Sequence, residues 1–226
     1  MNILLFGATG MVGQGALREC LLDPDVDHVL AIGRTATGKT EPKLRELVRA
    51  DLWHYADIEG ELTNFDACLF CLGVSSAGMT EADYRRVTYD LTMAAAATLA
   101  RLNPRMVFLF VSGAGTDGSE KGHVMWARIK GITENALLRL PFRAAYMFRP
   151  GVIEALHGIE SKTPLYRRIY PFFRPLFPLL RRMFPNRITT TEELGRVMLA
   201  VAKEGAPKKI LETADICGWF ARRTDV

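Results

Sequence analysis

The sequence predicts an α/β fold with a doubly wound parallel sheet, and three observations support this prediction. Apolar runs typical of buried strands alternate with segments of helical character along most of the 226 residues. A glycine-rich turn directly follows the first apolar run, at residues 3–6. Hydrophobic residues form 49% of the chain, which is enough for one sizeable core and predicts a single domain over residues 1–226.

The composition limits the partners and the location that we expect. A formal net charge of +4 is too small to indicate binding of nucleic acid. No basic segment precedes a hydrophobic leader, so we expect no signal peptide and a cytoplasmic location. Cys68 and Cys71 lie three apart in a predicted strand and point to opposite faces, so they cannot share a metal or a disulfide. The four histidines are dispersed, and we expect no metal site.

The first strand leads into a glycine turn, and a helix is expected over residues 14–22. A strand, a glycine turn and a helix in this order form the phosphate-binding start of a Rossmann unit. Gly7 permits the sharp turn, Gly10 the approach of a pyrophosphate, and Gly13 close packing of the helix. The free N–H groups of the helix N-terminus would bind the anion. The predicted dinucleotide contacts of this turn are Gly7, Ala8, Thr9, Gly10, Met11, Val12 and Gly13.

The second strand is expected at residues 28–32, and Arg34 follows it almost directly. NAD-binding units place an acidic residue here to bind the ribose 2′-hydroxyl. The guanidinium of Arg34 could instead bind a 2′-phosphate and stack on the adenine, with Lys39 in support. We therefore favour NADP(H) over NAD(H) as the cofactor, the alternative being that Arg34 is a solvated surface residue.

The third and fourth strands supply further cofactor contacts. A short strand is expected to end near residue 50, which puts Asp51 and Leu52 where doubly wound folds contact the adenine. The fourth strand is expected over residues 64–72. Its end would face the ribose of the cofactor through Cys71, Leu72 and Gly73.

The second half of the chain continues the alternation. Thr80 is the predicted N-cap of one long helix that reaches about residue 102. The fifth strand, residues 106–111, delivers Ser112 to the carboxyl edge of the sheet, where α/β proteins bind ligands. A helix from residue 123 or 124 to 138 and a sixth strand at residues 143–149 follow.

These residues together resemble the short-chain dehydrogenase/reductase superfamily. The nearest similarity is to its small atypical members of epimerase- or dehydratase-like type, including the Tat-interacting-protein-like branch, and it spans residues 1–216. The features that carry it are the glycine turn, Ser112, Lys130 on the following helix, and Arg149-Pro150-Gly151-Val152. The resemblance implies that Ser112 holds a substrate oxygen and Lys130 binds the nicotinamide ribose. It also implies cofactor contacts at Pro150, Gly151 and Val152.

One position departs from the family. The catalytic Tyr of these enzymes stands four residues before the Lys, where this chain has Trp126. An indole N–H donates a hydrogen bond but does not release its proton near neutral pH. Three alternatives remain: His123 replaces the acid, the reaction needs no Tyr, or the protein binds its cofactor without turnover.

Other hydroxyl groups are weaker candidates on the sequence. Tyr84, Tyr89 and Tyr146 fall on the long helix or within a strand, where core packing is the better interpretation. Thr88 occupies the approximate position of an Asn that assists a proton relay in the family, and its hydroxyl could do the same.

Aromatic residues and arginines alternate in residues 164–187, where several prolines also occur. The segment is too charged to span a membrane. We expect a substrate-side elaboration within residues 154–190, with contact to an anionic membrane or to a protein as alternatives. Thr190 and Glu193 form a predicted capping box that starts a helix to about residue 203, and residues 208–212 are expected to add an edge strand.

The leading interpretation is an NADP(H)-binding oxidoreductase or epimerase-like enzyme that acts on an unidentified apolar small molecule. A homodimer is expected only by analogy with the family. The alternative is a regulatory or interaction protein that binds the cofactor without catalysis.

Overall fold

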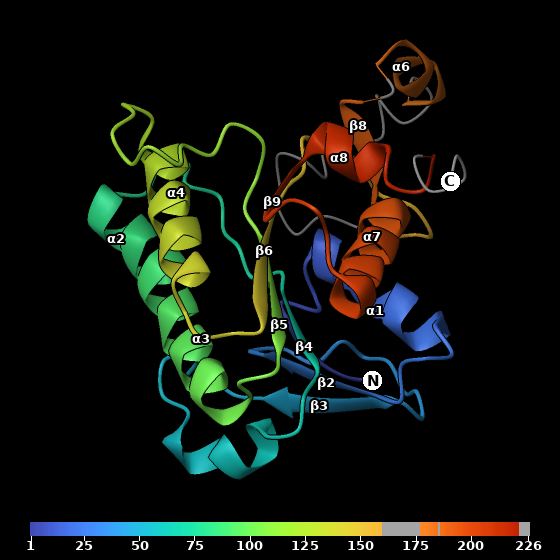
Figure 1. Ribbon diagram of the computed structural model, residues 1–226. Helices are drawn as coiled ribbons and strands as arrows, with labels where there is room; N and C mark the ends of the chain where they lie inside the picture. Colours follow the sequence, from blue (N-terminus) through green and yellow to red (C-terminus); the bar gives the residue numbers. More distant parts are fainter. Residues whose placement is uncertain (160–176, 185, 222–226) are drawn as a thin grey trace.

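The computed structural model describes residues 1–159, 177–184 and 186–221, and Figure 1 shows their arrangement. A seven-stranded parallel sheet forms the centre, with strand order β3-β2-β1-β4-β5-β6-β9. This order confirms the predicted Rossmann-type doubly wound sheet. The strands are β1 (Asn2–Phe6), β2 (His28–Gly33), β3 (Leu44–Val48), β4 (Ala67–Phe70), β5 (Val107–Val111), β6 (Ala144–Arg149) and β9 (Ile210–Glu212).

Helices cover both faces of the sheet (Figure 1). On one face, α1 (Met11–Leu22) and α7 (Thr191–Glu204) pack over Ile3 and Leu5. On the other, α3 (Leu91–Leu102) packs over Leu4 and Phe6, with α2 (Glu81–Arg85) and α4 (Met125–Leu138) beside it. Successive strand residues point to opposite faces, so β1 contributes equally to two cores. A 3-10 helix, Ala56–Leu62, follows β3.

The helix predicted over residues 80–102 begins as expected but is not one regular helix. The Thr80 side chain accepts a hydrogen bond from the backbone N–H of Asp83, which confirms Thr80 as the N-cap. A π-helical segment, Arg86–Asp90, separates α2 from α3. Such wide turns inside α-helices occur frequently at functional sites. Thr88 is buried within this one.

The contact between α1 and α7 depends on two glycines that the sequence analysis did not single out. A Cβ built on Gly15 would lie 2.5 Å from the carbonyl oxygen of Thr191. A Cβ on Gly195 would lie 3.0 Å from the carbonyl oxygen of Gly15. The two helix backbones therefore approach each other at a distance that side chains would prevent.

The C-terminal part adds a second, two-stranded parallel sheet of β7 (Val152–Glu154) and β8 (Ile188–Thr190). Two short helices, α6 (Phe177–Met183) and α8 (Thr213–Cys217), complete the described part. Most of the aromatic and arginine-rich segment 164–187, and with it much of the elaboration predicted over residues 154–190, lies outside the described residues. In the described ranges, no helix combines the length and the apolar character that a membrane span requires.

The predicted capping box at Thr190 is half present. The Thr190 hydroxyl accepts a hydrogen bond from the backbone N–H of Glu193 at 2.9 Å, and α7 begins there. The Glu193 carboxylate accepts a bond from the Thr189 hydroxyl at 2.8 Å. The reciprocal bond back to the N-cap is therefore replaced by a bond to the neighbouring strand residue.

Candidate functional site

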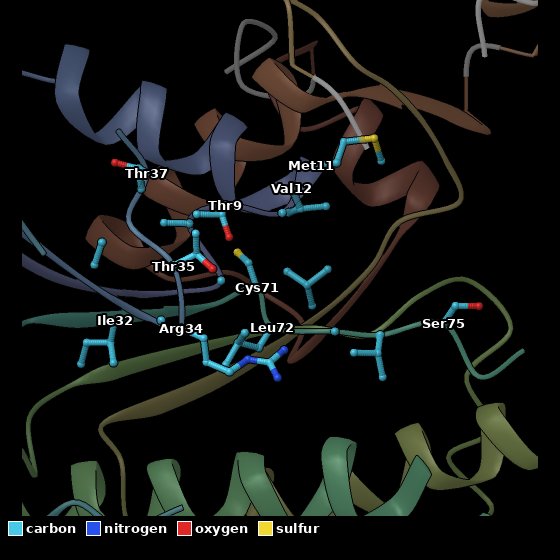
Figure 2. Close-up of a pocket in the computed structure, with 18 of the residues that line it drawn as sticks. Thr9, Met11, Val12, Ile32, Arg34, Thr35, Thr37, Cys71, Leu72 and Ser75 are labelled. Atoms are coloured by element: carbon cyan, nitrogen blue, oxygen red, sulfur yellow. The ribbon is translucent and has the colours of Figure 1, made fainter. Parts of the chain in front are cut away.

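A cavity of about 770 Å³ lies at the carboxyl ends of β1, β2, β4 and β5 (Figure 2). Its volume falls within the usual range for ligand sites. Parts of α1, α2 and α4 complete its wall. The predicted site residues that line it are Gly7, Ala8, Thr9, Gly10, Met11, Val12, Arg34, Cys71, Leu72, Gly73, Ser112, Trp126 and Lys130.

Two glycines of the turn are required by the protein itself. Gly7 has a φ of +79°, and a Cβ there would lie 2.8 Å from the backbone of Cys71 and Leu72. A Cβ on Gly13 would lie 2.0 Å from the carbonyl oxygen of Gly7. Gly7 thus makes the turn possible and Gly13 lets α1 start directly against it.

At Gly10 and Gly73 the space that a side chain would fill belongs to the cavity and not to the protein. A Cβ on Gly10 would meet only the carbonyl oxygen of Gly7, at 3.4 Å, and a Cβ on Gly73 would meet nothing within 4 Å. Neither has a positive φ, yet both line the cavity. Side chains at these positions would project into space that a ligand needs. The first-turn N–H groups of α1, which have no partner inside the helix, begin just after Gly10. These features fit a dinucleotide pyrophosphate.

The region after β2 forms another wall of the cavity. Arg34 is exposed, and its side chain extends into the cavity, away from Thr37, as Figure 2 shows. Glu46 on β3 also lines the cavity, and its carboxylate accepts a hydrogen bond from the backbone N–H of Thr37 at 2.6 Å. Glu46 could not be predicted as a site residue, because an edge strand of mixed polarity gives no signal for which of its residues face the cavity.

Asp51 and Leu52 lie apart from the described cavity lining. Leu52 is buried in the core on the α3 face of the sheet. The Asp51 carboxylate accepts hydrogen bonds from the backbone N–H of Trp53, at 2.8 Å, and from His54. The bond from Trp53 contributes most to lowering the pKa of Asp51. The structure therefore gives both residues local roles, and their predicted contact with an adenine stays a prediction.

Ser112 is held by a buried carboxylate. Its hydroxyl donates to Oε1 of Glu134, with the carbonyl oxygen of Phe148 as a second acceptor at 3.1 Å. Glu134 is fully buried on α4, and its Oε2 lies 2.6 Å from Nη2 of Arg149. Arg149 also binds Glu212 at 2.9 Å. The hydroxyl has a single proton and donates it toward these two acceptors, so the cavity meets the oxygen lone pairs.

Lys130 lies one helical turn before Glu134 on the same helix. Its ammonium donates to the backbone carbonyl of Ser112 at 2.8 Å and to that of Val111 at 3.3 Å. Burial lowers the pKa of Lys130 to about 8, although the nearby charge of Glu134 opposes this shift. Two of the three ammonium protons thus hold the end of β5, and one remains for a ligand.

The position of the missing Tyr is inside the cavity. Trp126 lines it, and a Cβ built on Gly115 would lie 3.6 Å from the indole ring. His123 is exposed, precedes the first residue of α4, and is not among the described lining residues. Tyr84 of α2 does line the cavity. Tyr84 is also 2% exposed, which confirms the predicted core packing; its place beside the cavity was not predicted, because helix periodicity alone does not show which helices border a cavity.

Four of the predicted cofactor contacts are not among the described residues that line the cavity. They are Gly13 and the three residues that follow β6, namely Pro150, Gly151 and Val152. A Cβ on Gly151 would lie 3.1 Å from the carbonyl oxygen of Arg187, so this glycine serves the packing of the second sheet. The Pro150 carbonyl accepts a hydrogen bond from the N–H of Ala114, and Val152 pairs with Ile188 in β7 and β8. The cofactor contacts implied for Pro150, Gly151 and Val152 stay predictions.

The chain matches no known family model. Comparison with curated proteins finds the protein fmp52, mitochondrial, of Emericella nidulans, 30% identical over 159 residues that cover 67% of this chain and 66% of that protein. The protein fmp52-2, mitochondrial, of Aspergillus oryzae is 26% identical over 217 residues, covering 94% of this chain and 93% of that protein. The chain is therefore similar in sequence to these FMP52 proteins.

Solved structures share its fold at low sequence identity. A short-chain dehydrogenase family protein of Francisella tularensis superposes with a TM-score of 0.63 at 16% identity, over 90% of this chain and 91% of that one. The Bordetella bronchiseptica enzyme WbmF in complex with NAD⁺ gives 0.69 at 13% identity, over 99% of this chain and 78% of that one. This chain thus has the Rossmann fold that is also seen in a short-chain dehydrogenase family protein and in a UDP-glucose 4-epimerase.

The expected cytoplasmic location is wrong in the light of these relatives. The FMP52 proteins that match most of the chain are all named mitochondrial. The expectation depended on the lack of a secretory signal, which does not distinguish the cytoplasm from an organelle.

Proposed function

We propose that this chain binds a nicotinamide dinucleotide, with NADP(H) preferred, and acts as an oxidoreductase or epimerase-like enzyme on a small apolar substrate. One observation carries the proposal: Gly10 and Gly73 line the cavity although no contact with the described residues requires glycine there. A ligand that approaches the backbone closely explains both. The glycine turn and Lys130 lie in the same cavity, as a dinucleotide that runs from pyrophosphate to nicotinamide would require.

The roles of the cofactor-binding residues follow from their places in the wall. The N–H groups at the start of α1 would bind the pyrophosphate. Arg34 would bind the 2′-phosphate through its guanidinium. Lys130 would donate its remaining N–H to the nicotinamide ribose while it holds the end of β5. A bound nicotinamide would supply or accept the hydride.

Ser112 has a narrower role than the family resemblance implies. Its proton is directed to Glu134, so it offers a lone pair, and not a donor, to a substrate. Ser112 therefore fits a substrate group that donates a hydrogen bond, such as a hydroxyl beside the reacting carbon. A carbonyl oxygen must obtain its donor from another residue.

A second candidate function comes from Trp126. With an indole where the family has its acid, the chain could bind its cofactor as a sensor or scaffold without turnover. The same cavity serves both candidates, since neither changes how the dinucleotide is bound.

Two measurements distinguish these functions. We expect NADPH to bind, and Lys130→Ala to weaken the binding markedly while the exposed Lys121→Ala does not. We then expect NADPH to be consumed with at least one member of a panel of apolar aldehydes and ketones. Binding without consumption over the whole panel, together with a gain of activity in Trp126→Tyr, would support the non-catalytic function. Absence of binding would contradict both.

A further inference from the structure

The proposed enzyme needs a group that gives a proton to the substrate oxygen, and the residues expected there are already engaged or unsuitable. The Ser112 proton is directed to Glu134. The Trp126 indole does not release its proton. Lys130 directs two of its protons to the backbone carbonyls at the end of β5. The cavity therefore needs a further acid, and this inference rests on the proposed function.

Tyr84 is the phenol that borders the same cavity as Ser112, Trp126 and Lys130 in the described part of the chain. It is 2% exposed, so its ring is packed among other side chains and held in place. Lys130 and Trp126 are four residues apart on α4 and therefore share one face of that helix. The phenol approaches the cavity from α2, which lies against α4.

One contact joins α2 to α4. Glu81, in the first turn of α2, forms an ion pair with Arg128 of α4 at 2.7 Å. The backbone N–H of Tyr84 donates to the carbonyl of the N-cap Thr80 at 3.0 Å, which is the first hydrogen bond of the helix itself. Because Glu81 and Tyr84 are three residues apart, they share one side of α2. The ion pair to α4 thus sets that side of α2 beside the helix that carries Trp126 and Lys130.

Thr88 lies one helical turn after Tyr84, and its side chain lowers the pKa of the Tyr84 phenol. Thr88 is buried in the π-helical segment, and its carbonyl accepts the Thr92 hydroxyl at 2.5 Å. Burial raises the pKa of Tyr84 above its ordinary value, although the Thr88 side chain opposes this shift. The phenol therefore holds its proton at neutral pH, as an acid must before it acts.

We propose that Tyr84 is the catalytic acid of this site, in place of the Tyr that Trp126 replaces. In carbonyl reduction, the carbonyl carbon receives a hydride from a reduced nicotinamide while the carbonyl oxygen takes the phenol proton of Tyr84. The products are an alcohol and the Tyr84 phenolate. The phenolate then recovers a proton from solvent through the cavity that Tyr84 lines. In alcohol oxidation, the same proton moves in the opposite direction.

The first test follows Tyr84 itself and needs no substrate. Tyrosinate absorbance is titrated against pH for the unmodified protein and for Tyr84→Phe, each with and without NADP⁺. Under each condition the Tyr84→Phe curve is subtracted from the curve of the unmodified protein, which leaves the titration of Tyr84. We expect the difference to show Tyr84 ionising at a pH about 1 to 3 lower with NADP⁺, because the cationic nicotinamide stabilises a nearby phenolate. Tyr89→Phe, whose phenol is not among the described lining residues, should show no such change. An unchanged titration of Tyr84 in the NADP⁺ complex overturns the proposal.

The second test uses turnover. We expect Tyr84→Phe to keep its NADPH affinity and to lose about 10²- to 10⁴-fold in carbonyl reduction, with no loss in Tyr89→Phe. Adding Trp126→Tyr to Tyr84→Phe should restore activity, because it returns a phenol to the family's position. Reduction by Tyr84→Phe at the unmodified rate overturns the role of Tyr84 and leaves the proposed function standing. Failure of the unmodified protein to bind NADPH or NADP⁺ overturns both.

Discussion

The Ser112 hydroxyl donates a hydrogen bond to Glu134 at 2.5 Å, although the two residues lie on different elements and are 22 positions apart. Glu134 is fully buried, and the Arg149 guanidinium lies 2.6 Å from its second oxygen. This arrangement joins β5, α4 and β6 at the edge of the cavity. It also decides which way Ser112 presents its proton.

We predict that Glu134→Ala destabilises the protein strongly. The substitution leaves the mostly buried Arg149 guanidinium without its main partner, and removal of one member of a buried ion pair costs about 3–5 kcal/mol. Chemical denaturation of the variant measures the loss. The matched control Glu41→Ala removes an exposed carboxylate and should change the free energy of unfolding by about 0.5 kcal/mol or less. A loss for Glu134→Ala as small as that of the control contradicts this account.

Gly10 and Gly13 should respond in opposite ways to alanine. Gly13→Ala places a methyl 2.0 Å from the Gly7 carbonyl oxygen and should destabilise the fold by about 3 kcal/mol. Gly10→Ala meets the protein only at 3.4 Å and should cost about 1 kcal/mol or less at this N-cap. Its NADPH affinity should nevertheless fall by about tenfold or more, because the methyl enters the cavity. Thermal unfolding and calorimetry measure the two effects, and unchanged affinity in Gly10→Ala would remove the main support for the cofactor site.

The stability of the protein should depend on pH through Lys130. Burial lowers the folded pKa of Lys130 to about 8 from an ordinary value of 10.5. Between these values the unfolded chain holds a proton that the folded chain has lost, so stability rises with pH across this window. The free energy of unfolding of the unmodified protein should therefore rise relative to Lys130→Met from pH 8 to 10.5. The exposed Lys121→Met should show no such trend, and a flat difference for Lys130→Met would contradict the shifted pKa.

The fold was predictable because its signals are local. Residues 3–6 and 106–111 are apolar without interruption, as strands of a parallel sheet with helices on both faces must be. Gly7 and Gly13 are required by contacts within a few residues or with the adjacent strand. The order of the sheet then follows from the alternation of strands and helices.

The rest of the site depends on contacts between distant residues. Nothing in the local sequence distinguishes Glu134 from a solvated acidic residue on α4, because its burial arises when Arg149 arrives from β6. Tyr84 reads as a core residue on a helix, and only the placement of α2 against α4 brings it to the cavity. Gly15 and Gly195 become necessary only where two helices 180 positions apart in the chain touch.

The central claim, that the cavity binds a nicotinamide dinucleotide through the glycine turn and Arg34, is tested most directly by calorimetric titration with NADPH and NADH in parallel. We predict that both bind and that NADPH binds more tightly. Arg34→Gln should lower the NADPH affinity about tenfold and leave the NADH affinity unchanged, because only the 2′-phosphate loses its charged partner. Preference for NADH would contradict the role of Arg34 while the cavity assignment stands. Binding of neither nucleotide would contradict the claim itself.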